Sequence, residues 1–209
     1  NEDLMKIIEA KAKGKTKKTE TKEEVSTTAV DLMAQLKAIF GFDREVSRAS
    51  GGFGTVLIVE DNQAPEEREE KRAAIKIIAA KNRGTASMKL WVKEIENELA
   101  MLSKFKGHPN FVQLYDHAWL YDQAGKLRYS AFKTEYLSSD LHQLLRQGPM
   151  DLESLTALAL DLATGVAHAH SLKIVLHDIK LENVMIRCTR TFIKKTYVLI
   201  DLGLAKEYD

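Results

Sequence analysis

Cysteine is nearly absent from the sequence. Its one cysteine, Cys188, cannot form an internal disulfide and argues against a metal cluster built from thiolates; a lone residue of this kind is most often a partly buried, inert thiol. Long apolar runs are also absent, since no stretch approaches the roughly 20 residues that cross a bilayer, and the lysine-rich segment Asn1–Lys22 lacks the apolar core of a secretory signal. These absences favour a reducing, cytoplasmic location and no membrane partner.

An excess of charge of either sign is lacking as well. The 31 basic and 30 acidic residues leave a formal net charge of +1, which gives no bulk attraction to nucleic acid or acidic lipid. We therefore expect no nucleic-acid partner. The hydrophobic share of 44% and the charged share of 29% are ordinary for a soluble globular protein, and a chain of 209 residues can bury one good core or two small ones.

Residues 1–40 differ in character from the rest. Residues 11–24 form a charged tract with no apolar period and are expected to be a linker. From Ser26 to Phe40, apolar residues recur near helical spacing and predict an amphipathic helix that Gly41 ends. Its apolar stripe consists of Val30, Met33, Leu36, Ile39 and Phe40. We expect the stripe to pack on the following domain, with binding of a membrane or a regulatory partner as the alternative.

The remaining chain divides into a strand-rich part, residues 41–136, and a helical part, residues 137–209. Apolar patterns predict strands at Phe42–Arg48, Thr55–Glu60, Ala73–Ala79, Phe111–Leu120 and Leu127–Tyr136, with a helix at Met88–Phe105. The charged stretch Asp61–Arg72 is interpreted as a solvated turn. Later elements are helices at Asp140–Gln147 and Leu152–Leu172 and short strands at Val184–Ile186 and Tyr197–Ile200. The apolar content of the long helix predicts deep burial, and the fold class is α+β.

A glycine-rich segment joins the first two predicted strands. Its sequence is Ala49-Ser50-Gly51-Gly52-Phe53-Gly54-Thr55-Val56, and glycines allow backbone N–H groups to approach phosphate oxygens closely. A hairpin of this kind is by itself usually only a turn. It resembles the G-x-G-x-x-G-x-V loop that covers nucleotide phosphates in protein kinases, with Ala49 at the first glycine position. A strand follows the segment, which excludes a dinucleotide-binding motif.

The next strand ends in a lysine that extends this resemblance. Residues Ala73-Ala74-Ile75-Lys76 resemble the V-A-I-K strand of protein kinases, in which the lysine pairs with the α- and β-phosphates and with a helix glutamate. Glu94 and Glu98 share one face of the predicted helix. The later segment Gly107-His108-Pro109-Asn110 resembles the H-P-N segment after that helix, and its distance favours Glu98 as the partner.

The resemblance also implies where adenine would bind. Residues Thr134-Glu135-Tyr136-Leu137 occupy the position of the hinge between two lobes, whose backbone would bind the adenine edge. Thr134 would stand at the mouth of the back pocket. The apolar residues expected to sandwich the ring are Val56, Ala74 and Met185, although each could equally be ordinary core.

The most informative stretch follows the long helix. Residues Leu176-His177-Asp178-Ile179-Lys180-Leu181-Glu182-Asn183 resemble the H-R-D-x-K-x-x-N catalytic loop. The resemblance implies that Asp178 orients the substrate hydroxyl and accepts its proton, and that Asn183 binds magnesium. Lys180 would contact the transferring phosphoryl group, an arrangement typical of Ser/Thr kinases. Asp201-Leu202-Gly203 resembles D-F-G, so Asp201 would be the second magnesium ligand.

Two positions of the catalytic loop depart from the family pattern. Leu176 replaces a histidine and can fill apolar space but cannot donate a hydrogen bond. His177 replaces an arginine that grips a phosphorylated activation segment in many kinases, and a neutral imidazole is a poor phosphate clamp. We therefore expect activation not to depend strongly on such phosphorylation.

Together these motifs predict a two-lobed protein-kinase-like fold with a five-stranded antiparallel sheet and one helix in the first lobe and a partial helical second lobe. The resemblance covers Phe42–Asp209 and lacks the family's later helices, so we expect a piece of a longer chain or completion by another segment. The implied activity is transfer of the γ-phosphoryl group of ATP, with Mg²⁺, to a protein serine or threonine. The alternatives are a kinase-like scaffold without catalysis and a small-molecule phosphotransferase.

Overall fold

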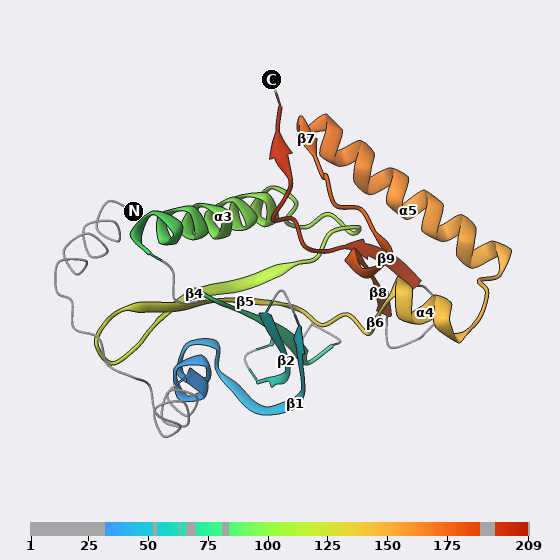
Figure 1. Cartoon of the computed structure of the whole chain (residues 1–209). Coiled ribbons are helices and arrows are strands. Elements are labelled where there is room, and N and C mark those ends of the chain that lie inside the picture. Colours follow the sequence, from blue (N-terminus) through green and yellow to red (C-terminus); the bar gives the residue numbers. More distant parts are fainter. Residues whose placement is uncertain are drawn as a thin grey trace.

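A computed structural model describes residues 32–51, 54–62, 64–65, 70–80, 84–188 and 195–208. The charged linker, the predicted helical residues 26–31, and Gly52 and Phe53 of the glycine-rich segment lie outside these residues. The α+β prediction is confirmed, because the described chain combines one five-stranded antiparallel sheet with several helices (Figure 1).

The sheet has the strand order β1-β2-β3-β5-β4. Its strands are β1 (Phe42–Gly51), β2 (Gly54–Asp61), β3 (Arg72–Ala79), β4 (Leu114–Tyr121) and β5 (Leu127–Glu135), and helix α3 (Thr85–Lys104) follows β3. All five predicted strands are present with shifted ends. Residues 111–113 lie outside β4, and Phe111 instead forms an isolated parallel bridge with Leu199.

The helical part begins directly after β5. It contains β6 (Ser139–Asp140), α4 (Leu141–Gln147), α5 (Leu152–Ser171), β7 (Ile174–Val175), the 3₁₀ turn η1 (Leu181–Asn183), β8 (Val184–Cys188), β9 (Lys195–Leu199) and β10 (Lys206–Glu207). Asp140 and Asp151 cap α4 and α5 by accepting hydrogen bonds from the backbone N–H groups of Gln143 (2.7 Å) and Ser154 (2.6 Å).

Alternation along the strands gives the sheet two apolar faces. Successive side chains of a strand point to opposite faces, so Ala74 and Lys76 share one face of β3 while Ala73, Ile75 and Ile77 share the other. The first face packs against α3 through Phe132 and the α3 residues Trp91, Val92 and Ile95. Val56, Lys76 and Thr134 therefore lie on the α3 side of the sheet, and the opposite face needs a different cover.

Residues 32–40 form a helix that covers this opposite face (Figure 1). Leu36 and Phe40 are 0% and 1% exposed and pack against Leu57, Ile75 and other residues of the sheet, which confirms the expected docking on the following domain. Gly41 ends the helix with a φ of 59°, a left-handed conformation that glycine adopts without strain. Assigning Ile39 to the apolar stripe was wrong, because its side chain is 42% exposed. The sheet occupies the apolar side of this helix, so a partner would have to bind its exposed side.

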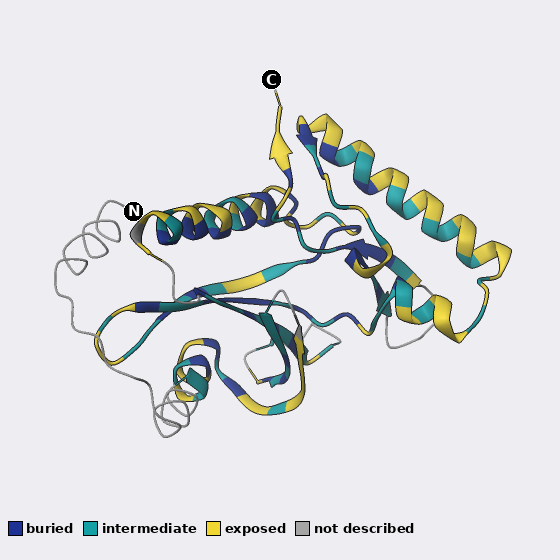
Figure 2. Cartoon of the chain, in the orientation of Figure 1, coloured by how far each residue is buried: buried dark blue, intermediate teal, exposed yellow. Residues whose placement is uncertain are grey.

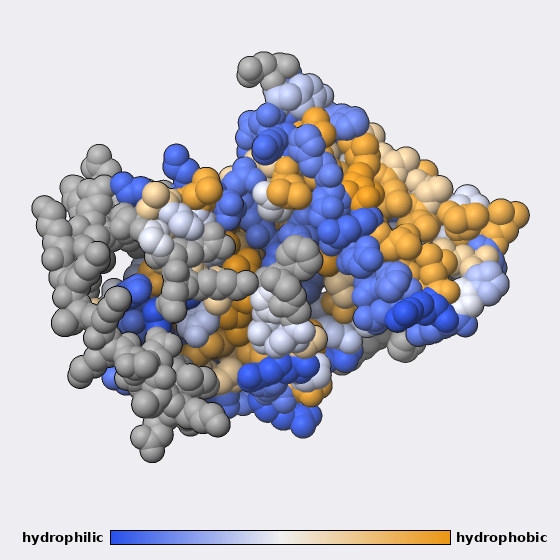
Figure 3. Space-filling view, viewed as in Figure 1, coloured by the Kyte–Doolittle hydropathy of each residue, from blue (hydrophilic) through white to orange (hydrophobic). Residues whose placement is uncertain are grey.

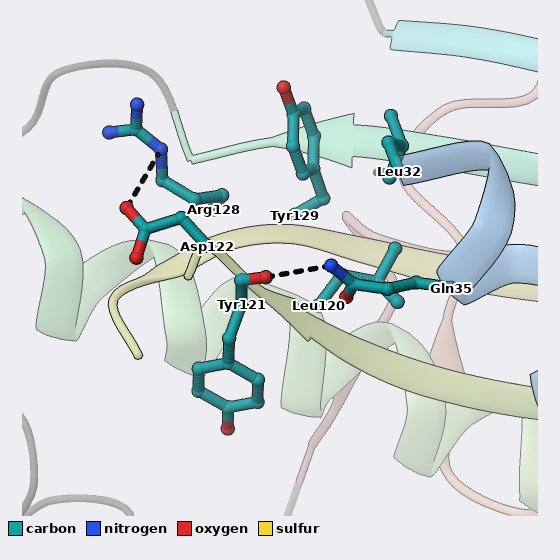
Figure 4. Close-up of a pocket in the computed structure, with 7 residues that line it drawn as sticks. All are labelled: Leu32, Gln35, Leu120, Tyr121, Asp122, Arg128 and Tyr129. Carbon is teal, nitrogen blue, oxygen red and sulfur yellow. Dashed lines mark hydrogen bonds and ion pairs between the residues drawn. The ribbon is translucent and has the colours of Figure 1, made fainter. Parts of the chain in front are cut away.

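Polar contacts hold the helix of residues 32–40 against the sheet near both of its ends. Near its start, Gln35 donates a hydrogen bond of 3.0 Å to the carbonyl oxygen of Tyr121, beside a cavity of about 10 Å³ bordered by Leu32, Leu120 and Tyr129 (Figure 4). At its end, the buried Lys133 ammonium donates to the carbonyl oxygen of Phe40 at 2.9 Å and to Asp61 Oδ1 at 2.7 Å. Asp61 is only 5% exposed, so interpreting it as part of a solvated turn was wrong.

A partly buried histidine on the α3 face predicts a pH-dependent stability. His117 shares a 2.8 Å hydrogen bond with Ser130 Oγ and contacts the rings of Trp119 and Phe132. Burial lowers the pKa of His117 from 6.5 to about 4, although the Asp116 carboxylate partly opposes the shift. The unfolded chain therefore takes up a proton at a higher pH than the folded chain, and stability falls as the pH falls from 6.5 towards 4. Urea denaturation at pH 7 and pH 5 measures the loss of unfolding free energy between the two pH values. This loss should be smaller in His117→Gln than in the wild type, and an equal loss in the two proteins would contradict this account.

The predicted deep burial of the long helix is not what the described residues show. Only Gly165 and Ala169 of α5 are buried, whereas Leu152 and Leu160 are 79% and 66% exposed. Figure 2 shows mainly exposed and intermediate residues along α5, and Figure 3 shows apolar surface gathered over the same region. Much of the apolar surface of α5 is therefore not covered by the other described residues. Among the described helices, none is long and apolar enough to cross a membrane.

Candidate active site

Lys76 joins three separate parts of the fold. Its Nζ atom lies 2.9 Å from Glu98 Oε1 on α3 and 3.3 Å from Asp201 Oδ1 in the segment after β9. Burial by itself lowers the pKa of Lys76, but the two carboxylates outweigh that effect and raise it, so the lysine stays charged. Glu94, the other candidate on α3, is exposed, and the helix presents Glu98 to the lysine. A charged amine next to two carboxylates can neutralise an incoming phosphate.

The loop before β8 gathers the second set of predicted residues. Lys180 Nζ lies 2.7 Å from Asp178 Oδ2, and Asn183 Nδ2 donates to the same oxygen at 2.8 Å and to the Asp178 carbonyl at 3.0 Å. The hydrogen bond from Lys180 lowers the pKa of Asp178, and the bond from Asn183 acts in the same direction. Asp178 is therefore ionised and oriented at neutral pH.

The strands on either side of the glycine-rich segment are paired as far as Gly51 and Gly54. Ala49 pairs with Val56 and Ser50 with Thr55 across the hairpin, and the hydroxyls of Ser50 and Thr55 are 3.0 Å apart. Gly54 has a φ of 131°, and a Cβ atom there would lie 2.3 Å from the carbonyl oxygen of Ile77. Glycine is thus required at position 54 by close backbone approach. Gly51 pairs with Gly54 at the end of the ladder.

The residues expected around adenine lie on β2, β3, β5 and β8 and in the segment after β5. Val56 and Ala74 belong to neighbouring strands on the α3 face, and Thr134 is the β5 partner of Ala74. The hydroxyl of Thr134 donates to the carbonyl oxygen of Glu135 at 3.2 Å. Leu137 is buried, and Met185 of β8 is partly buried against the same core. The sheet thus contributes Val56, Ala74 and Thr134, and the chain after β5 contributes Leu137 and Met185.

Comparison with known proteins gives an independent finding. Residues 46–209 match the protein kinase domain family. The chain belongs to this family. The match begins within β1 and includes the glycine hairpin, Lys76, Glu98, the catalytic-loop residues and Asp201, so the predicted kinase resemblance and two-lobed fold class are confirmed.

Several protein kinases are similar to the chain. It is 26% identical over 158 residues to mitogen-activated protein kinase SLT2/MPK1 of Saccharomyces cerevisiae, covering 75% of this chain and 31% of the relative. It is 26% identical over 174 residues to myosin light chain kinase A of Dictyostelium discoideum (83% and 53%) and over 170 residues to serine/threonine-protein kinase 33 of Bos taurus (80% and 31%). The chain thus spans between about a third and about a half of the lengths of these relatives.

The two departures from the family pattern, Leu176 and His177, lie in different surroundings. Leu176 is 7% exposed and belongs to the same hydrophobic cluster as Leu202, which is 3% exposed, so both leucines fill apolar space. His177 is exposed and has a φ of 58°, which is uncommon for a residue other than glycine. Its side chain is therefore not part of the core that supports Asp178.

The sequence did not predict a hydrogen-bonded ion pair between Glu135, in the expected hinge segment, and Arg187. The Glu135 carboxylate accepts hydrogen bonds from Arg187 Nε (2.7 Å), Arg187 Nη2 (2.5 Å) and the backbone N–H of Gln113 (2.9 Å). Arg187 also donates to the carbonyl oxygen of Pro109 at 2.5 Å. The side chain of Glu135 and its backbone N–H, which donates to the carbonyl oxygen of Gln113 at 3.0 Å, are therefore both committed within the protein. The bidentate pairing of Arg187 and Glu135 had no signal in the sequence beyond two opposite charges.

Proposed function

We propose that the protein is a serine/threonine protein kinase that transfers the γ-phosphoryl group of ATP to a protein hydroxyl. The observation that carries this proposal is the contact of Lys76 with both Glu98 and Asp201. A protein kinase needs its strand lysine, helix glutamate and metal-binding aspartate in place together, and all three meet here. The substrate class rests on Lys180 beside Asp178 and on serine/threonine kinases among the relatives.

Each of these residues would have a separate role in phosphoryl transfer. Lys76 would hold the α- and β-phosphates, and the backbone of residues 49–54 would cover them with N–H groups. Asp178 would orient the substrate hydroxyl and accept its proton. The hydroxyl oxygen forms a bond to the γ-phosphorus while the bond from that phosphorus to the β–γ bridging oxygen breaks, and ADP leaves. The lowered pKa of Asp178 suits a group whose main task is orientation, because the transition state of phosphoryl transfer is loose.

The oxygen atoms near Lys76 and Asp178 fit a magnesium ion. Asn183 uses its amide nitrogen to donate to Asp178, while its Oδ1 oxygen accepts no hydrogen bond from the described residues. Asp201 contributes a carboxylate, and Mg²⁺ is commonly bound by one or two such groups together with substrate phosphates. When bound, the ion would neutralise charge on the β- and γ-phosphates. Asn183 and Asp201 would hold it.

Phosphoryl transfer by the complete protein tests the proposal. With γ-labelled ATP, Mg²⁺ and a mixture of protein substrates, we expect label on serine or threonine, and chelation of Mg²⁺ with EDTA should reduce incorporation to background. The amino acids that carry the label are identified after acid hydrolysis. Label found only on tyrosine would reject the substrate class.

A kinase-like scaffold that binds nucleotide and regulates a partner is the second candidate. It is favoured by Ala49, Leu176 and His177, which depart from the family pattern. Absence of transfer, together with retained binding of a fluorescent ATP analogue, would replace the catalytic proposal by this one.

A further inference from the structure

An asparagine on α3 holds the segment that follows Asp201. The side-chain nitrogen Nδ2 of Asn97 lies 3.1 Å from the carbonyl oxygen of Gly203 and 3.1 Å from that of Ala205. A primary amide carries two N–H bonds, so one side chain can donate to both carbonyls. These bonds span more than a hundred residues of sequence and join α3 directly to the turn after Asp201.

Asn97 stands next to Glu98, which binds Lys76. One turn of α3 is therefore connected to Asp201 in two ways: through the Glu98–Lys76 pair and through the backbone two and four residues beyond Asp201. Gly203 packs against the same place, since a Cβ atom there would lie 3.6 Å from Glu98 Oε2 and 3.8 Å from Asp201 Oδ1. The backbone around Asp201 is thus enclosed between the side chains of Lys76, Glu98 and Asn97.

The backbone at Asp201 needs external support. Its φ of 57° places a non-glycine residue in the left-handed region, a conformation that persists only when surrounding contacts determine it. Upstream, Ile200 donates its N–H to the Asn183 carbonyl at 2.9 Å. Downstream, the Ala205 N–H donates to the Leu202 carbonyl at 3.0 Å and closes a turn. The side-chain amide of Asn97 donates to the Gly203 and Ala205 carbonyls of the same segment.

A second contact further along α3 acts on the same segment. Lys104, seven residues after Asn97 and so on the same helix face, pairs with Glu207 of β10 at 2.5 Å. Figure 1 shows β10 beside the end of α3. The side chains of this pair are 39% and 56% exposed, and exposed pairs contribute little. Asn97, which is partly buried and makes two bonds, is the stronger connection.

We propose that Asn97 is a positioning residue that sets the place of Asp201 and thereby the affinity of the site for the metal–nucleotide complex. The proposal rests on the proposed function in that it takes Asp201 as a metal ligand. In this role Asn97 acts through its hydrogen bonds to the carbonyl oxygens of Gly203 and Ala205. Loss of its amide would let the Asp201 turn move while Lys76, Glu98 and the sheet stay in place.

The test compares Asn97→Asp with Asn97→Gln in the complete protein. Aspartate has the same shape but turns a carboxylate towards two carbonyl oxygens, whereas glutamine keeps the donor. We expect the Mg²⁺ concentration that half-saturates binding of a non-hydrolysable, fluorescent ATP analogue to rise about tenfold in Asn97→Asp, the size expected from two lost hydrogen bonds. Asn97→Gln should recover most of the affinity. The control, Glu94→Gln on the exposed side of α3, should match the wild type.

Hydrogen exchange supplies a readout that does not depend on turnover or on bound metal. Backbone amides of residues 203–207 should exchange about tenfold faster in Asn97→Asp, with β3 and β5 unchanged. Unchanged exchange at 203–207, acceleration throughout the sheet, or an unaltered Mg²⁺ dependence would each overturn the proposal. Failure of the wild type to transfer phosphate would reject the proposed catalysis but leave these binding and exchange results able to support or overturn the role of Asn97.

Discussion

Replacing Asp178 by alanine is expected to lower the rate constant of phosphoryl transfer by about 10²- to 10⁴-fold, the usual contribution of a positioned general base, with little change in ATP affinity. Asp178 lies beside Lys180 and Asn183 in the structure, and among the described residues no hydrogen bond or ion pair joins it to Lys76, Glu98 or Asp201. Its removal should therefore affect the chemical step and leave the nucleotide pocket intact. The measurement is kcat, in parallel with the dissociation constant of an ATP analogue.

Asp116→Asn is the matched control for this substitution. Asp116 is an exposed carboxylate on β4 that accepts a hydrogen bond from the backbone N–H of His117, and its change should leave kcat within about twofold, as for most surface substitutions. Full activity in Asp178→Ala would remove Asp178 from the mechanism. A parallel loss of nucleotide affinity would instead assign it to binding.

Replacing Lys133 by methionine is expected to destabilise the protein by about 3–5 kcal/mol, the typical cost of removing one partner from a buried ion pair. Lys133 and Asp61 have side chains only 6% and 3% exposed. Methionine would fill similar space, but Asp61 would lose its adjacent cation and the Phe40 carbonyl would lose its donor. The helix of residues 32–40 would then be held mainly by its apolar contacts. Urea denaturation of the complete protein measures the change.

Two further variants separate charge from packing. The double substitution Lys133→Met with Asp61→Leu should recover much of the lost stability, because replacing both members of a buried pair by apolar residues is often nearly neutral. Lys37→Met, at an exposed lysine that donates to the Asp43 carbonyl, should change stability by less than about 0.5 kcal/mol. Equal effects of Lys37→Met and Lys133→Met would show that the buried pair has no special role.

The sequence was sufficient for much of the fold. Alternating apolar residues predicted the strands of the sheet because each strand contributes to two apolar faces, and Gly41 marked the end of the N-terminal helix. The motifs also predicted that Lys76 pairs with Glu98, whereas the contacts of Lys76 with Asp201 and of Asp178 with Asn183 were found only in the structure. The predicted pair follows from the register of strands and loops that a family pattern carries with it.

Other contacts depend on packing that no local pattern records. Asp61 lies in a run of charges that resembles a solvated turn, yet it pairs with Lys133 inside the sheet–helix junction. Asn97 and Arg187 bind backbone carbonyls far away in sequence, and an asparagine or arginine on an element surface has no signature for such a role. The apolar content of α5 predicted burial, but whether an apolar helix is buried depends on what packs against it.

The most direct measurement of the central claim is label transfer from γ-labelled ATP to protein by the wild-type complete protein, run beside Asp178→Ala and Lys76→Met. The assembled site predicts incorporation by the wild type and near-background incorporation by both variants, Lys76→Met through weakened phosphate binding and Asp178→Ala through the chemical step. Equal incorporation by all three proteins would contradict it.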